Sequence, residues 1–305
     1  MPFTVVEYNC ENLYDCRHDS LKDDTEFLPD SKRQWTPSRY WRKLNGIARV
    51  IHQCGGKGKA WRLPDIVALL EVENDSTMLA LTRRSMIRTG GYRYVMTQSP
   101  DIRGLDVAML YNPLTFQVIN HHAIRITPTR KQRPTRDILY VKGRTRTNDT
   151  LHIFTIHAPS RRGGQAATEP YRIAVAQRMI QAIDSIRAIH HAASIIIAGD
   201  FNDYKYNKAL KLLKAKGMKN VTEHAKGRIA RGTYKHQGQW NSLDHILVST
   251  PLAGRVRESI IQDSQWMLAE EKNGGHKPYR TYLGPHYNGG VSDHLPLVIR
   301  MEFEY

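Results

Sequence analysis

Six short apolar segments, each bounded by turn-forming residues, constrain the fold of this chain more than any other sequence feature. They occupy residues 65–72, 106–112, 151–158, 194–199, 245–249 and 295–303. Apolar runs of this length are typical of strands that are buried in a sheet. Helical patterns lie between them, one opening at Thr36-Pro37 and another following Thr168 to about His191. This alternation predicts an α/β fold with at least two sheets covered by helices.

The remaining segments favour a single domain. Residues 92–98 and 116–124 have strand-like compositions and predict antiparallel neighbours of the strands beside them. No internal repeat and no Pro/Gly/Ser-rich linker interrupts the pattern, so we expect one domain over residues 1–305. The longest irregular pieces are 13–36 and 263–291, and loops of such length are commonly functional. A mean hydropathy of −0.53, with no apolar run approaching the ~18 residues of a membrane span, excludes a spanning helix.

The chain is strongly basic, since 45 Lys+Arg exceed 29 Asp+Glu by 16. Such an excess attracts polyanions, for example nucleic acid, phosphoinositides or an anionic membrane. Two stretches, 125–147 and 205–235, hold much of the positive charge. Each stretch is either a solvated face or a surface for a polyanion, and the sequence leaves both interpretations open. In the first stretch we expect Lys131, Arg133 and Arg136 to lie away from any catalytic cluster.

Cysteine usage bears on the cellular compartment. The three cysteines, Cys10, Cys16 and Cys54, are too few for a disulfide framework and have no CxxC spacing, which favours free thiols in a reducing compartment. A strand-like pattern that begins at Phe3 predicts that no signal peptide is present. We therefore expect a cytoplasmic protein, or an exported one if a signal peptide has been removed.

Polar residues gather where the predicted strands begin or end. Any one of them has an ordinary explanation, because Asn and Asp cap helices and form turns, and a single His near a strand is usually a hydrogen-bonded structural residue. So many at strand boundaries are harder to explain in this way. They are Asn9, Glu71, His157, Asp200, Asn202, Asp244, Asp293 and His294.

The types of these residues suit one kind of reaction. Oxygen donors such as Glu71 with Asp200, Asn9 or Asp293 are ligands for Mg²⁺ or Mn²⁺, and no HxxxH or Cys/His cluster indicates zinc. A histidine beside a carboxylate can transfer protons, and a divalent cation can stabilise charge on a phosphoryl oxygen. The GxSxG, Walker and Rossmann glycine patterns are absent, which argues against acyl transfer, nucleoside-triphosphate binding and hydride transfer.

Seven sequence motifs carry a family resemblance and cover nearly the whole chain. In chain order they are VVEYNCENLYD around Asn9, PDIVALLEVEN around Glu71, RGLDVAMLY from Arg103, HAPSRRGG from His157, IIIAGDFND around Asp200, LDHILVS around Asp244 and VSDHLPLV around Asp293. With these motifs the chain resembles the endonuclease/exonuclease/phosphatase superfamily, in a bacterial subgroup. The resemblance implies a four-layer α/β sandwich of the DNase I-like type, with two central mixed β-sheets flanked by helices and a metal site at one edge.

The resemblance also implies roles for the residues at that edge. Glu71 would be the main metal ligand, with Asn9 beside it and Asp293 in support. Asp200 would orient or deprotonate the attacking water. The three remaining residues of the cluster would act on the phosphoryl group: Asn202 would hold the water or the phosphate, and His294, paired with Asp244, would stabilise the phosphoryl group or exchange protons with it.

His157 would contact a phosphate oxygen or the leaving group, as the histidine at this position does in DNase-like members. Asp106 is placed by the resemblance as the carboxylate partner of His157 on an adjacent strand. Candidate phosphate contacts are Arg103, Ser160 and Arg162, and an exposed loop charge is an equally good interpretation of Arg162.

Three functions remain open from the sequence. The first is a Mg²⁺- or Mn²⁺-dependent hydrolase of phosphodiester bonds in nucleic acid, which the excess of 16 positive charges favours. The second is a phosphoesterase acting on a lipid headgroup or a small phosphorylated compound, similar to sphingomyelinases or inositol-phosphate phosphatases. The third, a non-catalytic polyanion-binding module, is disfavoured because every expected catalytic position is filled. The substrate therefore bears phosphate, and we expect a monomer without a stable protein partner.

Overall fold

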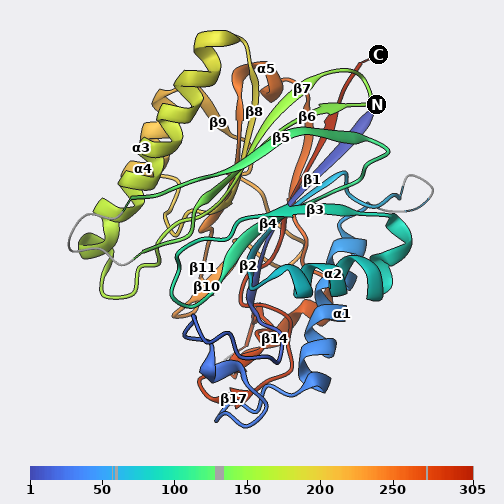
Figure 1. The fold of residues 1–305 in the computed structure, drawn as a ribbon, viewed down its shortest axis with the longest axis vertical. Coiled ribbons are helices and arrows are strands. Elements are labelled where there is room, and N and C mark those ends of the chain that lie inside the picture. Colours follow the sequence, from blue (N-terminus) through green and yellow to red (C-terminus); the bar gives the residue numbers. More distant parts are fainter. Residues whose placement is uncertain (57, 59–60, 128–133, 273, 305) are drawn as a thin grey trace.

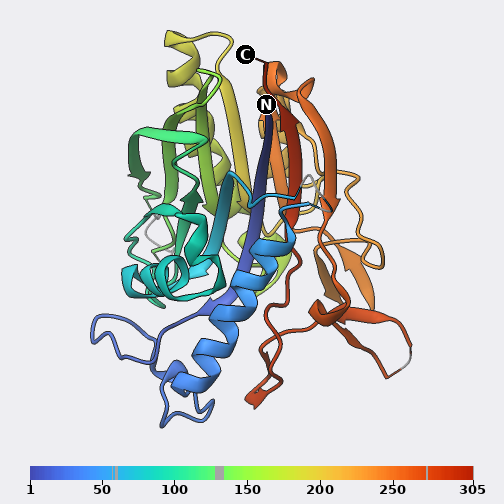
Figure 2. The ribbon, with the colours of Figure 1, turned by 90° about the vertical axis from the view of Figure 1, so that its right-hand side faces the viewer.

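The computed structural model of the chain describes residues 1–304 except 57, 59–60, 128–133 and 273. Two six-stranded mixed sheets pack face to face, with helices on both outer faces (Figures 1 and 2). This arrangement confirms the predicted four-layer sandwich. Strands β1 and β2 of the first sheet contact β7 and β8 of the second, so the core lies between the sheets.

The first sheet has the strand order β13-β18-β1-β2-β4-β3. Only β1 and β2 run parallel, and the other neighbours are antiparallel. The central strands are buried along almost their whole length, as their apolar sequences predict. Its strands are β1 (Pro2–Leu13), β2 (Ile66–Val72), β3 (Arg93–Met96), β4 (Asp106–Tyr111), β13 (Val256–Ile261) and β18 (Leu297–Glu302).

The second sheet has the strand order β5-β6-β7-β8-β12-β9, with only β7 and β8 parallel. Its edge strand β5 is exposed over most of its length, whereas β7, β8 and β12 are buried. Its strands are β5 (Phe116–Ile124), β6 (Ile138–Thr145), β7 (Thr150–His157), β8 (Ser194–Asp200), β9 (Met218–Asn220) and β12 (Asp244–Ser249). All the predicted strands are present, with ends within a few residues of the expected positions.

Helices α1 (Pro37–Gln53) and α2 (Asp75–Arg84) cover the first sheet, followed by the 3-10 helix η3 (Met86–Gly90). The start of α1 is as predicted, because Thr36 accepts a hydrogen bond from the Arg39 backbone N–H and Pro37 occupies the first helical position. Its apolar residues recur on one face and are buried: Tyr40, Leu44, Ile47 and Ile51.

Helices α3 (Gln165–Ile189) and α4 (Lys208–Ala215) cover the second sheet, and the short α5 (Thr250–Ala253) follows β12. The structure corrects the predicted start of α3, which precedes Thr168 by three residues. Thr168 lies inside the first turns and its hydroxyl donates to the Gly164 carbonyl, so it is not the capping residue. Pro170 is accommodated close to the N-terminus of α3, where few intrahelical bonds have formed.

The two segments predicted to be irregular contain short elements. Residues 13–36 include the 3-10 helix η1 (Thr25–Phe27), and residues 263–291 include η4 (Gln265–Met267). Three small hairpins occur outside the two large sheets. They are β10 (Tyr234–His236) with β11 (Gln239–Asn241), β14 (Leu268–Glu270) with β15 (His276–Pro278), and β16 (Tyr282–Leu283) with β17 (His286–Tyr287). Among the described residues, no helix has the length and apolar character needed to cross a bilayer.

The sheet registers bring the predicted polar residues to one edge. His157 at the end of β7 lies opposite Asp200 at the end of β8, and Asp200 also lies opposite Asp244 at the start of β12. In the first sheet, Asn9 pairs with Leu70, and the ladder shifts just beyond that point. Because the sheets pack face to face, these ends form one polar edge.

Candidate active site

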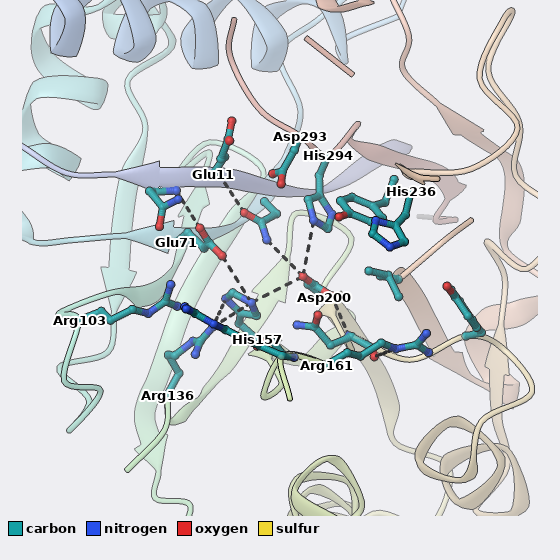
Figure 3. Close-up of a pocket in the computed structure, with 18 of the residues that line it drawn as sticks. Glu11, Glu71, Arg103, Arg136, His157, Arg161, Asp200, His236, Asp293 and His294 are labelled. Atoms are coloured by element: carbon teal, nitrogen blue, oxygen red, sulfur yellow. Dashed lines mark hydrogen bonds and ion pairs between the residues drawn. The ribbon is translucent and has the colours of Figure 1, made fainter. Parts of the chain in front are cut away.

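A cavity of about 720 Å³ opens at this polar edge between the two sheets (Figure 3). Ten of the twelve residues that the sequence singled out line it, and Asp244 lies directly behind His294. The ten are Asn9, Glu71, Arg103, His157, Ser160, Arg162, Asp200, Asn202, Asp293 and His294. The structure therefore brings residues from seven distant motifs into one site.

Asp200 lies at the centre of the cavity. Its Oδ2 accepts a hydrogen bond from Asn9 Nδ2 at 3.2 Å, and its Oδ1 accepts one from the Asn202 backbone N–H at 2.7 Å. The same Oδ2 lies 3.6 Å from His157 Nε2 and 4.0 Å from His294 Nε2. Burial and the nearby charge of Asp244 raise the pKa of Asp200 to about 7. A carboxyl group with such a pKa can both accept and release a proton near neutral pH.

His294 is paired with Asp244, as predicted. Its Nδ1 lies 2.8 Å from Asp244 Oδ2, and Thr233 donates its hydroxyl to the same carboxylate. The backbone N–H of His294 donates to Ser292 Oγ at 3.0 Å, which fixes the backbone from which the ring projects. Burial opposes a charge on His294, but Asp244 outweighs it and raises the pKa well above its usual value. These surroundings favour the protonated ring, whose Nε2 lies 4.0 Å from Asp200 Oδ2.

His157 has the opposite electrostatic surroundings. Arg136 Nη2 lies 2.9 Å from its Nε2 and 3.0 Å from its Nδ1, and Arg136 Nη1 donates to Asp101 Oδ2 at 3.2 Å. Burial, with the positive charges of Arg136 and Arg103, holds the pKa of His157 well below its usual value. The surroundings thus favour a neutral ring at His157 and a protonated ring at His294.

Two sequence predictions need correction here. Asp106 is not the partner of His157, because β4 belongs to the first sheet and β7 to the second; its carboxylate instead accepts hydrogen bonds from Thr97 and Ser99. Arg136 does not lie away from the cluster but is buried against His157. The other two residues predicted with it, Lys131 and Arg133, fall outside the described part of the chain.

Glu71 projects into the cavity from an unusual backbone position. Its φ is +58°, in the left-handed region, at the shift in register between β2 and β4. One carboxylate oxygen, Oε2, accepts from the Asn12 backbone N–H at 2.8 Å, and the other, Oε1, lies 3.7 Å from His157 Nε2. The bulge turns the side chain away from the strand face and toward the site.

The donor set at the cavity fits a divalent cation. Glu71 and Asp200 lie on either side of His157 Nε2, and ligand atoms of Asp200, Asp244 and His294 lie within 4.8 Å of one another. Repulsion among these carboxylates contributes to the raised pKa of Asp200, so a cation placed among them would be favourable. Asp244 is engaged by His294, whereas Glu71 and Asp200 each place one carboxylate oxygen within 3.7 Å of His157 Nε2. Asn9 lies beside Asp200, and its Oδ1 accepts from the Glu11 backbone N–H. Oxygen donors of this kind suit Mg²⁺ or Mn²⁺.

Asp293, predicted as a supporting ligand, forms an ion pair. Its Oδ2 lies 3.1 Å from Arg280 Nη2, and Arg280 Nε donates to Glu11 Oε1 at 3.1 Å. Glu11 also accepts from the Thr281 backbone N–H, and burial together with Asp293 raises its pKa to about 7. This cluster anchors the segment that leads to His294. Glu11 was not identified from the sequence, although it lies two residues beyond Asn9, just past the predicted end of the first strand.

Arginines line the wall of the cavity near Asn202. Arg161 Nε donates to the Asn202 carbonyl at 2.8 Å, and its guanidinium carbon lies 3.8 Å from the centre of the Tyr204 ring. Arg162 is exposed, and its backbone N–H approaches Ser160 Oγ at 3.4 Å. Arg161 was missed by the sequence analysis, although it adjoins Arg162 in the same motif.

A second buried acid lies beneath the His294–Asp244 pair. Glu7, in β1, is fully buried, and neither of its carboxylate oxygens has a hydrogen-bond partner among the described residues. Burial and the nearby charges of Asp244 and Asp200 raise its pKa well above the usual value. The signal available in the sequence was an acidic residue inside an otherwise apolar strand.

The layer order and the polar edge define the class of protein as a DNase I-like α/β sandwich. A family model described as "Endonuclease/Exonuclease/phosphatase family" matches residues 4–303, so the chain belongs to this family. Members of the family are phosphoesterase hydrolases that include phosphatases and nucleases. None of the curated protein sequences matches this chain.

Several solved structures resemble this one in fold. A mannosyl-6-phosphatase from Bacteroides thetaiotaomicron has 17% identity and a TM-score of 0.66, with 99% of this chain and 100% of that chain covered. A family protein from the same organism has 15% identity and a TM-score of 0.66, covering 100% and 99%. Truncated TDP2 from Caenorhabditis elegans has 17% identity and a TM-score of 0.61, covering 98% and 97%.

Proposed function

We propose that this protein is a Mg²⁺- or Mn²⁺-dependent phosphoesterase that hydrolyses phosphodiester bonds of nucleic acid. The observation that carries the proposal is the distribution of cationic side chains on both sides of Asp200. Arg103 and Arg136 lie on the His157 side and Arg161 lies on the other side of Asp200 (Figure 3). Arg161 contacts Asn202, and the adjacent Arg162 also lines the cavity. A single phosphate would not occupy both groups, whereas successive phosphates of a strand would.

The positive wall continues beyond the catalytic cavity. An adjoining cavity of about 280 Å³ shares Tyr234, His236 and Asp293 with it and adds Lys277 and Arg280. In the adjoining cavity Arg280 is paired with Glu11 and Asp293, and Lys235 is paired with Glu271, which also lines it. Lys277 is the remaining cation found to line this cavity, and it would supply a contact for a further phosphate of a bound strand.

The reaction would use the side chains around Asp200. A divalent cation, held by Glu71 with Asp200 and Asn9, would stabilise negative charge on the phosphoryl oxygens. Asp200 would orient the attacking water and accept its proton. His294, kept protonated by Asp244, would donate a hydrogen bond to a phosphoryl oxygen. His157 and Arg136 would contact the phosphate from the opposite side.

A phosphatase acting on a small phosphorylated compound is the second candidate. The cavity of about 720 Å³ is large enough for such a compound. Because Arg136 is turned inward, part of the basic stretch 125–147 serves the site itself and not a distant surface. The structural likeness to a mannosyl-6-phosphatase agrees with this candidate at the level of fold.

Salt dependence separates the two candidates. With Mn²⁺ present, kcat/KM would be measured on a short DNA or RNA strand and on bis(p-nitrophenyl) phosphate between 50 and 200 mM salt. Binding of a strand through several phosphates predicts a loss on the order of 10²–10³ for the polymer, because condensed counterions are released. The small diester should lose only a few-fold.

Two outer residues supply the matched variants. Lys277→Gln and Arg162→Gln should flatten the salt dependence on the strand and leave turnover of the small diester nearly unchanged. The exposed Lys211→Gln, on α4, is the charge-matched control. Efficient hydrolysis of sugar phosphates or other monoesters, with a shallow salt dependence on DNA and RNA, would contradict the nuclease proposal and favour the phosphatase.

A further inference from the structure

A second cavity, of about 370 Å³, lies on the outer face of the second sheet, between its β5–β7 strands and the C-terminal half of α3. Helix α3 starts at Gln165 in the catalytic cavity and reaches this second cavity near its other end. The two cavities have no lining residue in common. The second one therefore has no part in the site described above.

The floor of the second cavity is apolar and aromatic. Ile124, Ile186 and Ile189 line it, and Ile189 is 77% exposed at its mouth. The Tyr140 ring forms one wall, with the His122 ring 4.8 Å away between centroids. These surfaces suit an aromatic ring or a short acyl chain.

The polar lining of the second cavity consists of two cations and several neutral hydrogen-bonding side chains. His152 is 4% exposed, and its Nδ1 is engaged by the Tyr140 hydroxyl at 2.7 Å, while its Nε2 has no partner among the described residues. Lys142 and Arg178 supply positive charge, and no Asp or Glu is among the residues found to line the cavity. Lys142 forms no ion pair in the described part of the chain. The field inside the cavity is therefore positive.

We propose that this second cavity is a binding site for a small amphipathic anion, one ring system or short acyl chain carrying a carboxylate or sulfonate. The apolar part lies against Ile124, Ile186 and Tyr140. The anionic group is held by Lys142 and Arg178, and His152 Nε2 supplies a buried hydrogen-bonding group. This inference does not rest on the proposed catalytic function.

Two fluorescent probes of nearly equal shape test the proposal on the full chain. Anilinonaphthalene sulfonate carries the anion, and neutral N-phenylnaphthylamine does not. We expect saturable one-site binding of the sulfonate and binding of the neutral probe that is weaker by roughly tenfold, the effect of losing one charge-assisted hydrogen bond. Equal affinities would overturn the requirement for an anion.

Three variants locate the binding. Ala182→Phe fills the cavity from α3 and should abolish binding, while Lys142→Gln should weaken sulfonate binding by about fivefold. Lys211→Gln is the control with the same charge change elsewhere and should bind normally. Thermal unfolding of each variant checks that the fold is retained.

Nuclear magnetic resonance of the histidine rings identifies the cavity that is occupied. The sulfonate should shift the ring protons of His122, His152 and His190 and leave those of His157 and His294 unchanged. Shifts at the latter pair would place the probe in the catalytic cavity and overturn the proposal. So would a dimer that Ala182→Phe disrupts, because the cavity would then be an interface between copies.

Discussion

His157 and His294 approach Asp200 from two sides of one cavity, yet their pKa values are shifted in opposite directions. Their Nε2 atoms lie 3.6 and 4.0 Å from Asp200 Oδ2, and both side chains are almost fully buried. Burial alone would leave both rings neutral. Arg136 reinforces that effect at His157, whereas Asp244 reverses it at His294. The partner of a buried histidine, more than its burial, sets its charge in this site.

The difference gives the two sides of the cavity distinct chemistry. The Arg136 side favours a neutral ring, and the Asp244 side favours a protonated one. Asp200 is between them with a pKa of about 7. A phosphoryl group bound there would meet proton donors and acceptors fixed in advance, as general acid–base catalysis requires.

The largest effect should follow from removing the carboxylate beside the neutral histidine. Glu71→Gln preserves shape but removes a charged ligand, so turnover should fall by roughly 10³-fold or more with the fold retained. The measurement is kcat for bis(p-nitrophenyl) phosphate over a range of Mg²⁺ and Mn²⁺ concentrations, and circular dichroism checks that the fold is retained. Metal-induced stabilisation in thermal unfolding should be lost as well. The exposed Glu270→Gln is the control, and wild-type turnover of Glu71→Gln at saturating Mg²⁺ would contradict the assignment.

The protonated side can be tested by a double-mutant cycle. His294→Ala and Asp244→Asn should each lower kcat by roughly 10²-fold, because each removes the fixed proton donor. When two residues act as one unit, changing both lowers kcat little more than changing either one. The double variant should therefore resemble His294→Ala. Multiplication of the two losses would mean that the residues act separately.

The comparison becomes sharper in a direct titration of the two rings. Arg136→Met should raise the pKa of His157, since one of the charges that lowers it is gone, and burial should still keep it below the normal value. Asp244→Asn should lower the pKa of His294 by at least about one pH unit. Histidine ring resonances followed against pH report both. Changes in the same direction would refute the partner-based explanation.

The smallest effect concerns a buried acid outside the cavity. Burial, together with the nearby Asp15, raises the pKa of Glu73 to about 8 in the folded protein, above its value in the unfolded chain. The folded state binds the proton more tightly, so this contribution to stability is complete below about pH 4 and is lost as pH rises toward 8.

Glu73→Gln should therefore remove most of this loss of stability between pH 5 and pH 8. Urea unfolding at the two pH values measures the change, with Glu270→Gln as the control. An unchanged pH dependence would show that Glu73 ionises normally despite its burial.

The sequence was sufficient to predict the layer architecture and most of the polar edge. Buried strands have a strong local signal, and residues at strand ends meet when the sheets pack, as Glu71, Asp200 and His294 do. The position of Arg136 in the site could not be predicted in this way, because it depends on the register between β6 and β7. Leu139 of β6 pairs with Thr155 of β7, and this antiparallel pairing brings Arg136 beside His157.

The error at Asp106 has a similar origin. Its strand was expected beside that of His157, but the choice of sheet for each strand depends on long-range pairing that local patterns do not encode. Arg161, Glu11 and Glu7 were missed for another reason. Their neighbours in sequence were identified, and only tertiary packing shows which member of each motif faces inward.

The left-handed backbone at Glu71 has a consequence for how the protein could evolve. A non-glycine residue at a φ of +58° is strained by roughly 1 kcal/mol, and glycine would relieve that strain. A Glu71→Gly chain would thus gain backbone freedom at the bulge while losing the carboxylate beside His157. That chain would also lose the hydrogen bond that the Asn12 backbone N–H donates to the Glu71 carboxylate, so its stability would gain little or nothing. The left-handed backbone at the bulge is thus retained with the carboxylate that it places in the site.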